Sequence, residues 1–260
     1  MSSVCAMSGE ASHQQLADWV RESSSTVLFT GAGISTESGI DDFRSPGGVW
    51  TKMKPIQFDV FVSDEDARLE DWRRRFHFQA QFDAAPLNDG HHACAAILDS
   101  PGGEALVTQN IDGLHQRAGV ADTDIVEIHG NGTRGECLDC SAPMSLANAK
   151  AHIDTTGLSP RCARCGGLVK AAVISFGQPM PTDKVTRAAK LAQHCELFIV
   201  LGSSLVVQPA ARIPQIAATS GARLVIVNRE PTPLDALADL IIRDSIGVAM
   251  KPVLHALGRR

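Results

Sequence analysis

The chain has 260 residues and a formal net charge of −5 at neutral pH. This length is enough for one large domain with its own core, or for one domain with a small insert. The charge gives no overall attraction to nucleic acid or to an anionic membrane, and no apolar run approaches the roughly 20 residues of a spanning helix. The first 14 residues also lack the features of a secretory signal. We therefore expect a cytoplasmic protein with no direct nucleic-acid partner and no membrane contact.

Short aliphatic runs alternate with helical patterns along most of the chain. Ser12 is placed to cap a first helix, in which Leu16, Trp19 and Val20 recur at helical spacing. Strands are predicted at residues 26–30, 105–108, 125–128, 197–201, 224–227 and 240–242. Such runs are typical of strands buried on both faces of a parallel sheet. Because amphipathic stretches at 183–194 and 210–218 lie between them, the order predicts an α/β fold with a Rossmann-like, doubly wound parallel sheet.

Two regions interrupt this alternation. Residues 45–81 are rich in proline, glycine, aromatic and charged residues, and residues 133–168 carry four of the seven cysteines. We predict that a helical insert at 45–85 and a metal-binding insert at 133–168 form a small second lobe. The larger Rossmann-like domain would then comprise residues 1–44, 86–132 and 169–260.

A glycine-rich loop at residues 31–39 follows the first predicted strand. A dinucleotide-binding fold brings its backbone close to phosphate at this position. Gly31 and Gly33 fit the dehydrogenase fingerprint, but its third glycine would fall at Thr36. No acidic residue stands at the usual distance to hold an adenosine ribose. The sequence therefore disfavours a dehydrogenase, and the loop taken alone fits an ordinary turn equally well.

Polar side chains follow the second strand of the predicted sheet. Gln109, Asn110 and Asp112 come after a run that ends near Thr108, so we expect them at the carboxyl edge of the sheet, where ligands bind. Without further context, a turn or helix cap before Leu114 explains Asn110 and Asp112 better than a ligand site does.

Later strand ends carry further candidates, which are His129, Gly202, Ser203, Ser204, Asn228 and Arg229. A lone histidine is usually a hydrogen-bonded surface or core residue. His129 differs in its position, because it ends a predicted strand before Gly130, and an ordinary imidazole pKa near 6.5 suits a general base. The segment 202–204 could cradle a ribose or phosphate and the pair 228–229 could reach the adenosine side, although a plain strand-end turn remains an equal alternative for both.

Two Cys-x-x-Cys pairs form the most specific motif of the chain. Their members are Cys137, Cys140, Cys162 and Cys165, with 21 residues between the pairs. Each pair can place two thiolates on one tight turn, and two such turns close a tetrahedral zinc site with no open position. We predict one structural Zn²⁺, with a redox dithiol as the alternative.

Four segments in this order resemble the sirtuins, the NAD-consuming protein deacylases. They are residues 31–39, 108–115, 128–130 and the repeated Cys-x-x-Cys, and the resemblance extends from about Val27 to Val248. It is closest to a single-domain member of bacterial or archaeal type. The resemblance implies that the larger domain binds NAD as a co-substrate.

The resemblance also implies roles for individual residues. The residues implied for NAD binding are Gly31, Ala32, Gly33, Ser35, Asp42, Phe43, Arg44, Gln109, Asn110, Asp112, Gly202, Ser203, Ser204, Asn228, Arg229 and Ile246. The implied catalytic residues are His129, Asn110 and Asp112: His129 would activate a ribose hydroxyl, Asn110 would order a ribose hydroxyl and water, and Asp112 would hold the nicotinamide amide. Asp41 stands where the family usually has proline.

An acyl-lysine protein or peptide is the implied partner. In sirtuins, segments that match residues 173–178 and 205–208 hold the substrate between them as an added strand. Contacts with the substrate would come from Ile174, Phe176, Gly177 and Val207, and Phe43 would complete the wall of an apolar acyl tunnel. The family usually has an aromatic residue at Ser175 and glutamate at Gln178.

The implied function is an NAD-dependent protein lysine deacylase of deacetylase type, which releases nicotinamide, deacylated lysine and O-acyl-ADP-ribose. One alternative is a protein ADP-ribosyltransferase or NAD hydrolase. Another is a deacylase for acidic or longer acyl groups, and a third is a non-catalytic binding module.

The acyl preference depends on three consecutive arginines. Sirtuins that remove acidic acyl groups typically carry Tyr-x-x-Arg in the region that matches residues 71–76, but this chain has no tyrosine. The run Arg73, Arg74 and Arg75 is most simply a solvated helix face, although one inward guanidinium could pair with an acyl carboxylate. We therefore expect a neutral acyl group.

Overall fold

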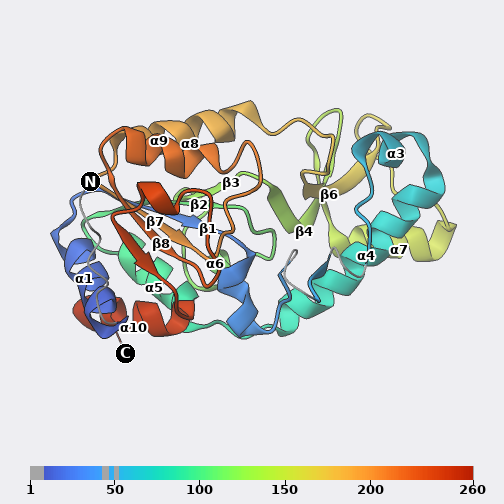
Figure 1. Cartoon of the computed structure of the whole chain (residues 1–260). Helices are drawn as coiled ribbons and strands as arrows, with labels where there is room; N and C mark the ends of the chain where they lie inside the picture. The colour runs from blue at the N-terminus through green and yellow to red at the C-terminus, as the bar shows by residue number, and fades with distance from the viewer. Residues whose placement is uncertain (1–8, 43–46, 50–52, 260) are drawn as a thin grey trace.

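The computed structural model describes residues 9–42, 47–49 and 53–259. Its elements form two parts, a layered α/β part on a six-stranded sheet and a smaller part on a three-stranded sheet with helices (Figure 1). Phe43 and Arg44, both predicted to contact NAD, lie outside the described residues.

The large sheet is parallel throughout. Its strands are β1 (Thr26–Thr30), β2 (Gly103–Thr108), β3 (Ile125–Glu127), β7 (Leu197–Leu201), β8 (Arg223–Val227) and β9 (Leu240–Ile242), in the order β3-β2-β1-β7-β8-β9. The chain extends the sheet outward from β1 first to one side and then to the other. In open α/β sheets a ligand crevice forms where this direction reverses, which here is between β1 and β7.

Helices cover both faces of this sheet (Figure 1). One face carries α1 (Gly9–Glu22), α5 (Asp89–Leu98) and α10 (Ile246–Ala256), and the other carries α8 (Thr182–His194) and α9 (Arg212–Thr219). Successive side chains of a strand point to opposite faces, so Leu28 packs in the first core while Val27 and Phe29 pack in the second. This two-sided burial explains why the strands read as continuous aliphatic runs, and the predicted fold class is confirmed.

The smaller part contains an antiparallel sheet in the order β5-β4-β6. Its strands are β4 (Gly130–Cys137), β5 (Pro143–Ser145) and β6 (Val169–Val173), and its helices are α3 (Phe58–Ser63), α4 (Glu65–Ala84) and α7 (Leu146–Thr156). Trp72 of α4 is fully buried and forms a small core with Leu146 and Val169. Because β6 pairs with β4, residues 169–173 lie in the small sheet, although the predicted range 169–260 placed them in the larger domain. The domain boundaries themselves stay a prediction.

Several local expectations differ from the structure. Ser12 lies inside α1, which already includes Gly9, so it does not cap that helix. His129 lies between β3 and β4 rather than at the end of a strand. The short elements are η1 (Ala32–Ser38), α6 (Leu114–Arg117) and η2 (Asp235–Leu237). Within the described ranges, every helix is too short or too polar to cross a bilayer.

Candidate active site and metal centre

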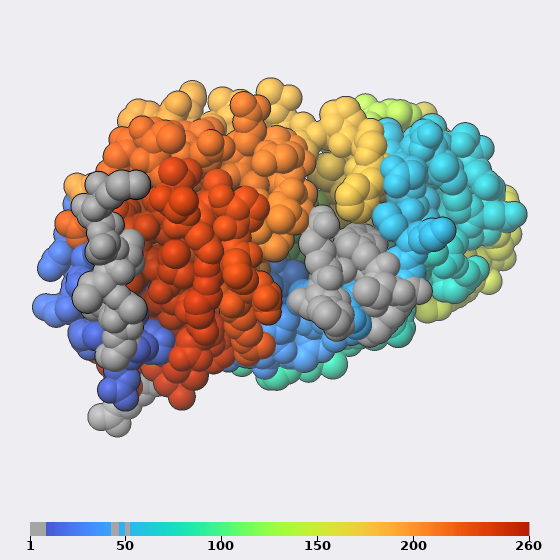
Figure 2. All heavy atoms as spheres, viewed as in Figure 1, coloured from blue at the N-terminus to red at the C-terminus, as the bar shows by residue number. Residues whose placement is uncertain are grey.

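A cavity of about 880 Å³ lies at the carboxyl ends of β1, β2, β7 and β8. Figure 2 shows a narrow cleft between the orange surface of the larger part and the yellow segment that adjoins the cyan helices of the smaller part. Predicted residues that line the cavity are Gly31, Ala32, Gly33, Asp42, Gln109, Asn110, His129, Ile174, Phe176, Gly177, Gly202, Ser203, Ser204, Val207, Asn228, Arg229 and Ile246. The fold therefore gathers residues that follow strands of both sheets around one space.

Two glycine-containing loops meet backbone to backbone at one wall of this cavity. A Cβ added to Gly33 would lie 2.7 Å from the Cα of Gly202, and one added to Gly31 would lie 2.7 Å from the carbonyl O of Gly202. The amides of Gly31 and Gly33 donate to the carbonyls of Leu201 and Gly202, at 3.0 and 2.9 Å. These two N–H groups are therefore used inside the protein, and the loop contributes shape rather than a set of free phosphate donors.

Most of the glycine-rich loop, Ala32–Ser38, forms a 3₁₀ helix rather than the α-helix of a dehydrogenase. Thr36, at the position of the missing third glycine, donates its hydroxyl to the carbonyl of Gly33 at 2.9 Å. In the dinucleotide fingerprint that glycine allows a helix to pack closely on its strand. The absence of the third glycine therefore agrees with the observed 3₁₀ helix, whose backbone differs from that of the α-helix in the dinucleotide fingerprint.

A buried polar network lies behind the cavity wall. The Ser35 hydroxyl donates to Oδ2 of Asp112 at 2.7 Å, and Nδ2 of Asn110 donates to the carbonyl of Gly31 at 3.2 Å. The other carboxylate oxygen of Asp112 accepts the amide of Leu114, the first residue of α6, at 2.9 Å, although the N-cap position of this helix is Gly113. Ser35 and Asp112 support Asn110 from behind rather than line the cavity.

The imidazole of His129 lines the same cavity as Asn110. Its Nδ1 lies 3.1 Å from the carbonyl O of Gln109. A carbonyl can only accept, so Nδ1 carries the proton and a neutral ring keeps Nε2 as a proton acceptor. Burial lowers the pKa of His129 from its ordinary value, while the hydrogen bond to Gln109 acts in the opposite direction. The ring is therefore neutral, and able to act as a base, at physiological pH.

One face of α4 also lines the cavity, and an inward arginine of the run 73–75 was the only contact that the sequence suggested from it. Arg75 is 9% exposed, and its Nε and Nη1 have no hydrogen-bond partner among the described residues. Arg74 instead bonds to Glu70 and to the carbonyl of Lys54, and Arg73 pairs with Glu70 at the surface. The solvated-face interpretation thus holds for Arg73 but not for Arg75. Arg75 precedes Phe78 and Phe82 at helical spacing, so the three residues share one face of α4. This spacing was the signal in the sequence that could have placed Arg75 at the cavity.

The four predicted cysteine ligands form one cluster. Their sulfur atoms all lie within 4.8 Å of one another, and the contacts Cys137–Cys165, Cys140–Cys162 and Cys140–Cys165 are 3.5, 3.7 and 3.4 Å. A disulfide would need about 2.05 Å. A tetrahedron with Zn–S bonds of about 2.3 Å has edges of about 3.8 Å. The donor set therefore fits one structural Zn²⁺ and leaves no position for substrate.

The two cysteine turns have the same backbone form. Ser141 donates its amide to the carbonyl of Cys137, and Gly166 donates to Cys162, at 3.0 and 2.8 Å. Both residues have positive φ, 55° and 77°. The matching turns hold four thiolates in place from two separate segments, which supports a structural role for the metal.

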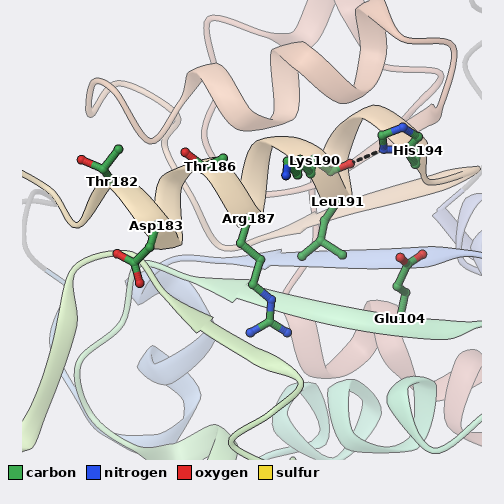
Figure 3. Close-up of a pocket in the computed structure, with 8 residues that line it drawn as sticks. All are labelled: Glu104, Thr182, Asp183, Thr186, Arg187, Lys190, Leu191 and His194. Atoms are coloured by element: carbon green, nitrogen blue, oxygen red, sulfur yellow. Dashed lines mark hydrogen bonds between the residues drawn. The ribbon is translucent and has the colours of Figure 1, made fainter.

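Another hollow lies along α8, away from the predicted site residues (Figure 3). Arg187 there donates to the carbonyl of Thr123, and His194 contacts the carbonyl of Lys190 one turn earlier at 2.7 Å. Both contacts lie within α8 or between α8 and a neighbouring loop. We therefore place the candidate active site in the cavity at the carboxyl ends of the strands, which the predicted residues line.

Comparison with known proteins agrees with this geometry. The model of the Sir2 family matches residues 31–209 of the chain. The chain belongs to the Sir2 family. An NAD-dependent protein deacetylase of Rhodopseudomonas palustris is 52% identical to this Sir2 protein over 92% of the chain and 94% of the relative. The NAD-dependent protein deacylase 2 of Pyrobaculum aerophilum is 36% identical over 94% and 96%.

Solved Sir2 structures have the same fold as this Sir2 protein. A Sir2 complex with a p53 peptide and NAD⁺ superposes with a TM-score of 0.79 at 36% identity, covering 94% of the chain and 98% of its own. Sir2Tm bound to a propionylated peptide superposes with a TM-score of 0.81 at 34% identity, covering 95% and 99%. The predicted family resemblance is confirmed.

Proposed function

We propose that this Sir2 protein is an NAD-dependent protein lysine deacylase of deacetylase type. The observation that carries the proposal is the convergence of Asn110 and His129 on one cavity at the sheet's reversal point, with Asp112 and Ser35 directly behind its wall and glycine loops that leave room for a dinucleotide. The 52% identity with a deacetylase supports it. A purely binding module would have no use for a histidine whose acceptor nitrogen is held in a ligand cavity.

Bound NAD would supply a ribose carbon that carries a cationic nicotinamide leaving group. The dinucleotide backbone would run close to the wall formed by Gly31, Gly33 and Gly202, because no side chain protrudes there. Asn110 would orient a ribose hydroxyl, and the Asp112 carboxylate, fixed by Ser35 and the α6 amide, would hold the nicotinamide amide.

His129 would act as the general base. Its Nδ1–H is occupied by the Gln109 carbonyl, so Nε2 is the nitrogen that would accept a proton from a ribose hydroxyl. Burial keeps the imidazole neutral, and the hydrogen bond restricts its rotation. As nicotinamide leaves, the acyl oxygen of the modified lysine would bond to the ribose carbon. The freed ribose oxygen would then attack the acyl carbon, and one water molecule would complete the release of lysine and O-acyl-ADP-ribose.

The segment after β6 would bind the substrate peptide as an added strand. Its first residue, Ile174, donates its amide to the carbonyl of His129 at 2.9 Å, and the carbonyl of Phe176 accepts the amide of Phe58 at 2.9 Å. The segment is thus tied both to the proposed base and to α3. Phe176 is 44% exposed, which suits an apolar contact with a partner.

The His129→Ala variant tests this function. We expect loss of deacetylation of an acetyl-lysine peptide, measured by mass spectrometry, with NAD binding near the wild-type value by calorimetry. Full activity in the variant would refute the role of His129. Transfer of labelled ADP-ribose to protein without an acyl substrate would instead favour the ADP-ribosyltransferase alternative.

Acidic acyl groups are a second candidate substrate class, favoured by one observation. Arg75 lines the cavity, and its guanidinium carries two buried nitrogen atoms, Nε and Nη1, that lack hydrogen-bond partners among the described residues. An acyl carboxylate bound in the cavity would pair with this cationic group. We therefore propose comparing acetyl-lysine and succinyl-lysine peptides. If Arg75 recognises the carboxylate, Arg75→Ala lowers only the succinyl rate; Arg74→Ala is the control, because Arg74 is already paired with Glu70.

The remaining expectations also stay proposals. We propose that the protein is cytoplasmic and binds no nucleic acid directly, supported by its net charge of −5. We likewise keep the division into an NAD-binding domain and a small lobe with helical and zinc-binding inserts, supported by the two separate sheets.

A further inference from the structure

The peptide group that joins Gln109 to Asn110 is held at both ends. Its carbonyl O, which belongs to Gln109, lies 3.1 Å from Nδ1 of His129. Its N–H, which belongs to Asn110, donates to the hydroxyl oxygen of Thr108 at 3.0 Å. A rotation of this one planar group would move both contacts together.

Thr108 is in turn held by two buried side chains. Thr30 donates its hydroxyl to Oγ1 of Thr108 at 2.8 Å, and Nε2 of His115 lies 2.9 Å from Oγ1 of Thr30. Thr30 and Thr108 are register partners at the last residues of β1 and β2. All three side chains are at most 3% exposed. Water therefore has no access to replace a lost partner.

The directions of these bonds are mutually consistent. Because Thr30 uses its proton toward Thr108, its oxygen accepts from Nε2–H of His115. Burial lowers the pKa of His115 to about 4, so its ring is neutral and carries this single proton on Nε2. The hydrogen bonds thus form a continuous chain from His115, through the hydroxyls of Thr30 and Thr108, to the Gln109–Asn110 peptide group and His129.

We propose that Thr108, supported by Thr30 and His115, is a positioning residue that sets the Nδ1–H tautomer and ring orientation of His129 by fixing the Gln109–Asn110 peptide group. The inference rests on the proposed role of His129 as the base. Thr108 lies behind the peptide group and does not line the cavity, so it acts on the reaction only through its neighbours. Removing the group that fixes the tautomer of a metal-ligating histidine typically costs about tenfold to a hundredfold in affinity or activity, and we expect a loss of the same order here.

The deciding variants are Thr108→Val and Thr108→Ser. Valine keeps the shape and strand preference of threonine but removes the hydroxyl, and serine keeps the hydroxyl. We expect Thr108→Val to lower kcat at least about tenfold with KM for NAD and peptide near wild-type values, and Thr108→Ser to restore most of kcat. Equal losses in both variants would overturn the proposal, because the hydroxyl would then not be the cause.

Thr26→Val is the matched control. Thr26 is a buried threonine at the opposite end of β1, and its hydroxyl has no partner among the described residues. This variant should keep the wild-type kcat. A loss as large as that of Thr108→Val would show a general effect of the sheet and would overturn the proposal. If Thr108→Val fails to fold, Thr30→Val removes the donor to Thr108 and should lower kcat in the same way.

A direct measurement separates this inference from the proposed function. Long-range ¹H–¹⁵N NMR of histidine-labelled protein, with His129 assigned by its absence in His129→Ala, reports the tautomer without any turnover. We expect the Nδ1–H tautomer in wild type and a mixture in Thr108→Val. An unchanged tautomer signal would overturn the inference even if kcat falls. A wild-type protein without deacylase activity would refute the proposed function alone, because the tautomer comparison would still decide the positioning role.

Discussion

The contact between the two glycine loops gives a quantitative prediction for Gly33→Ala. The added Cβ would lie 2.7 Å from the Cα and 2.8 Å from the carbonyl O of Gly202. Both are backbone atoms, so the clash can be relieved only by separating the loops that follow β1 and β7. Overpacking of this kind typically costs about 1–3 kcal/mol in the free energy of unfolding. For a chain of this size the loss corresponds to a fall in Tm of roughly 2–12 °C.

The same separation would displace the wall along which the dinucleotide passes, so we expect Gly33→Ala to weaken NAD binding as well. Thermal unfolding and calorimetric titration with NAD measure the two effects. Gly9→Ala is the control, because a Cβ there meets nothing within 4 Å and alanine is favourable in a helix. A Gly33→Ala protein with wild-type Tm and NAD affinity would refute the close packing of the loops as the reason for glycine.

Three further predictions follow from the buried groups. Removing zinc with a chelator should make the segment from Cys137 to Cys165 sensitive to protease while α8 and α9 stay protected; an unchanged digestion pattern would contradict a structural metal. Ser35→Ala should raise the KM for NAD by at least about tenfold, because a hydrogen bond to a buried carboxylate is worth about 1.5–3 kcal/mol; an unchanged KM would show that Asp112 needs no such support. Burial lowers the pKa of His91 to about 3 and of His115 to about 4, so below pH 6.5 the unfolded chain binds more protons than the folded one. The free energy of unfolding should therefore fall as the pH drops from 6.5 toward 4 in urea titrations, and a flat profile would contradict the burial of the two rings.

The large sheet could be predicted from sequence because its strands are buried on both faces. The limits of β1, β7 and β9 match the aliphatic runs residue for residue. An aliphatic run does not show which sheet its strand joins. The sequence therefore could not place β6, Val169–Val173, in the small sheet. Ser12 failed as a cap because a helix can begin before its first apolar repeat.

The site residues were predictable where they follow strands, and less so elsewhere. Asn110 and His129 were found because parallel strands bring their carboxyl ends to one edge. An inward arginine was considered for α4, but the sequence did not show which of the three it is. The helix buries Trp72 on one side and presents another side to the cavity, which blurs its apolar pattern. Thr30 and Thr108 gave no signal, since threonine is an ordinary strand residue.

The central claim is that the cavity around Asn110 and His129 couples NAD cleavage to removal of an acyl group from lysine. The most direct test is a mass-spectrometric balance of products from NAD and an acetyl-lysine peptide. We predict that nicotinamide, deacetylated peptide and O-acetyl-ADP-ribose form in equal amounts, and that His129→Ala forms none of them above background. Nicotinamide released at the same rate without the peptide, and with no O-acetyl-ADP-ribose, would contradict it.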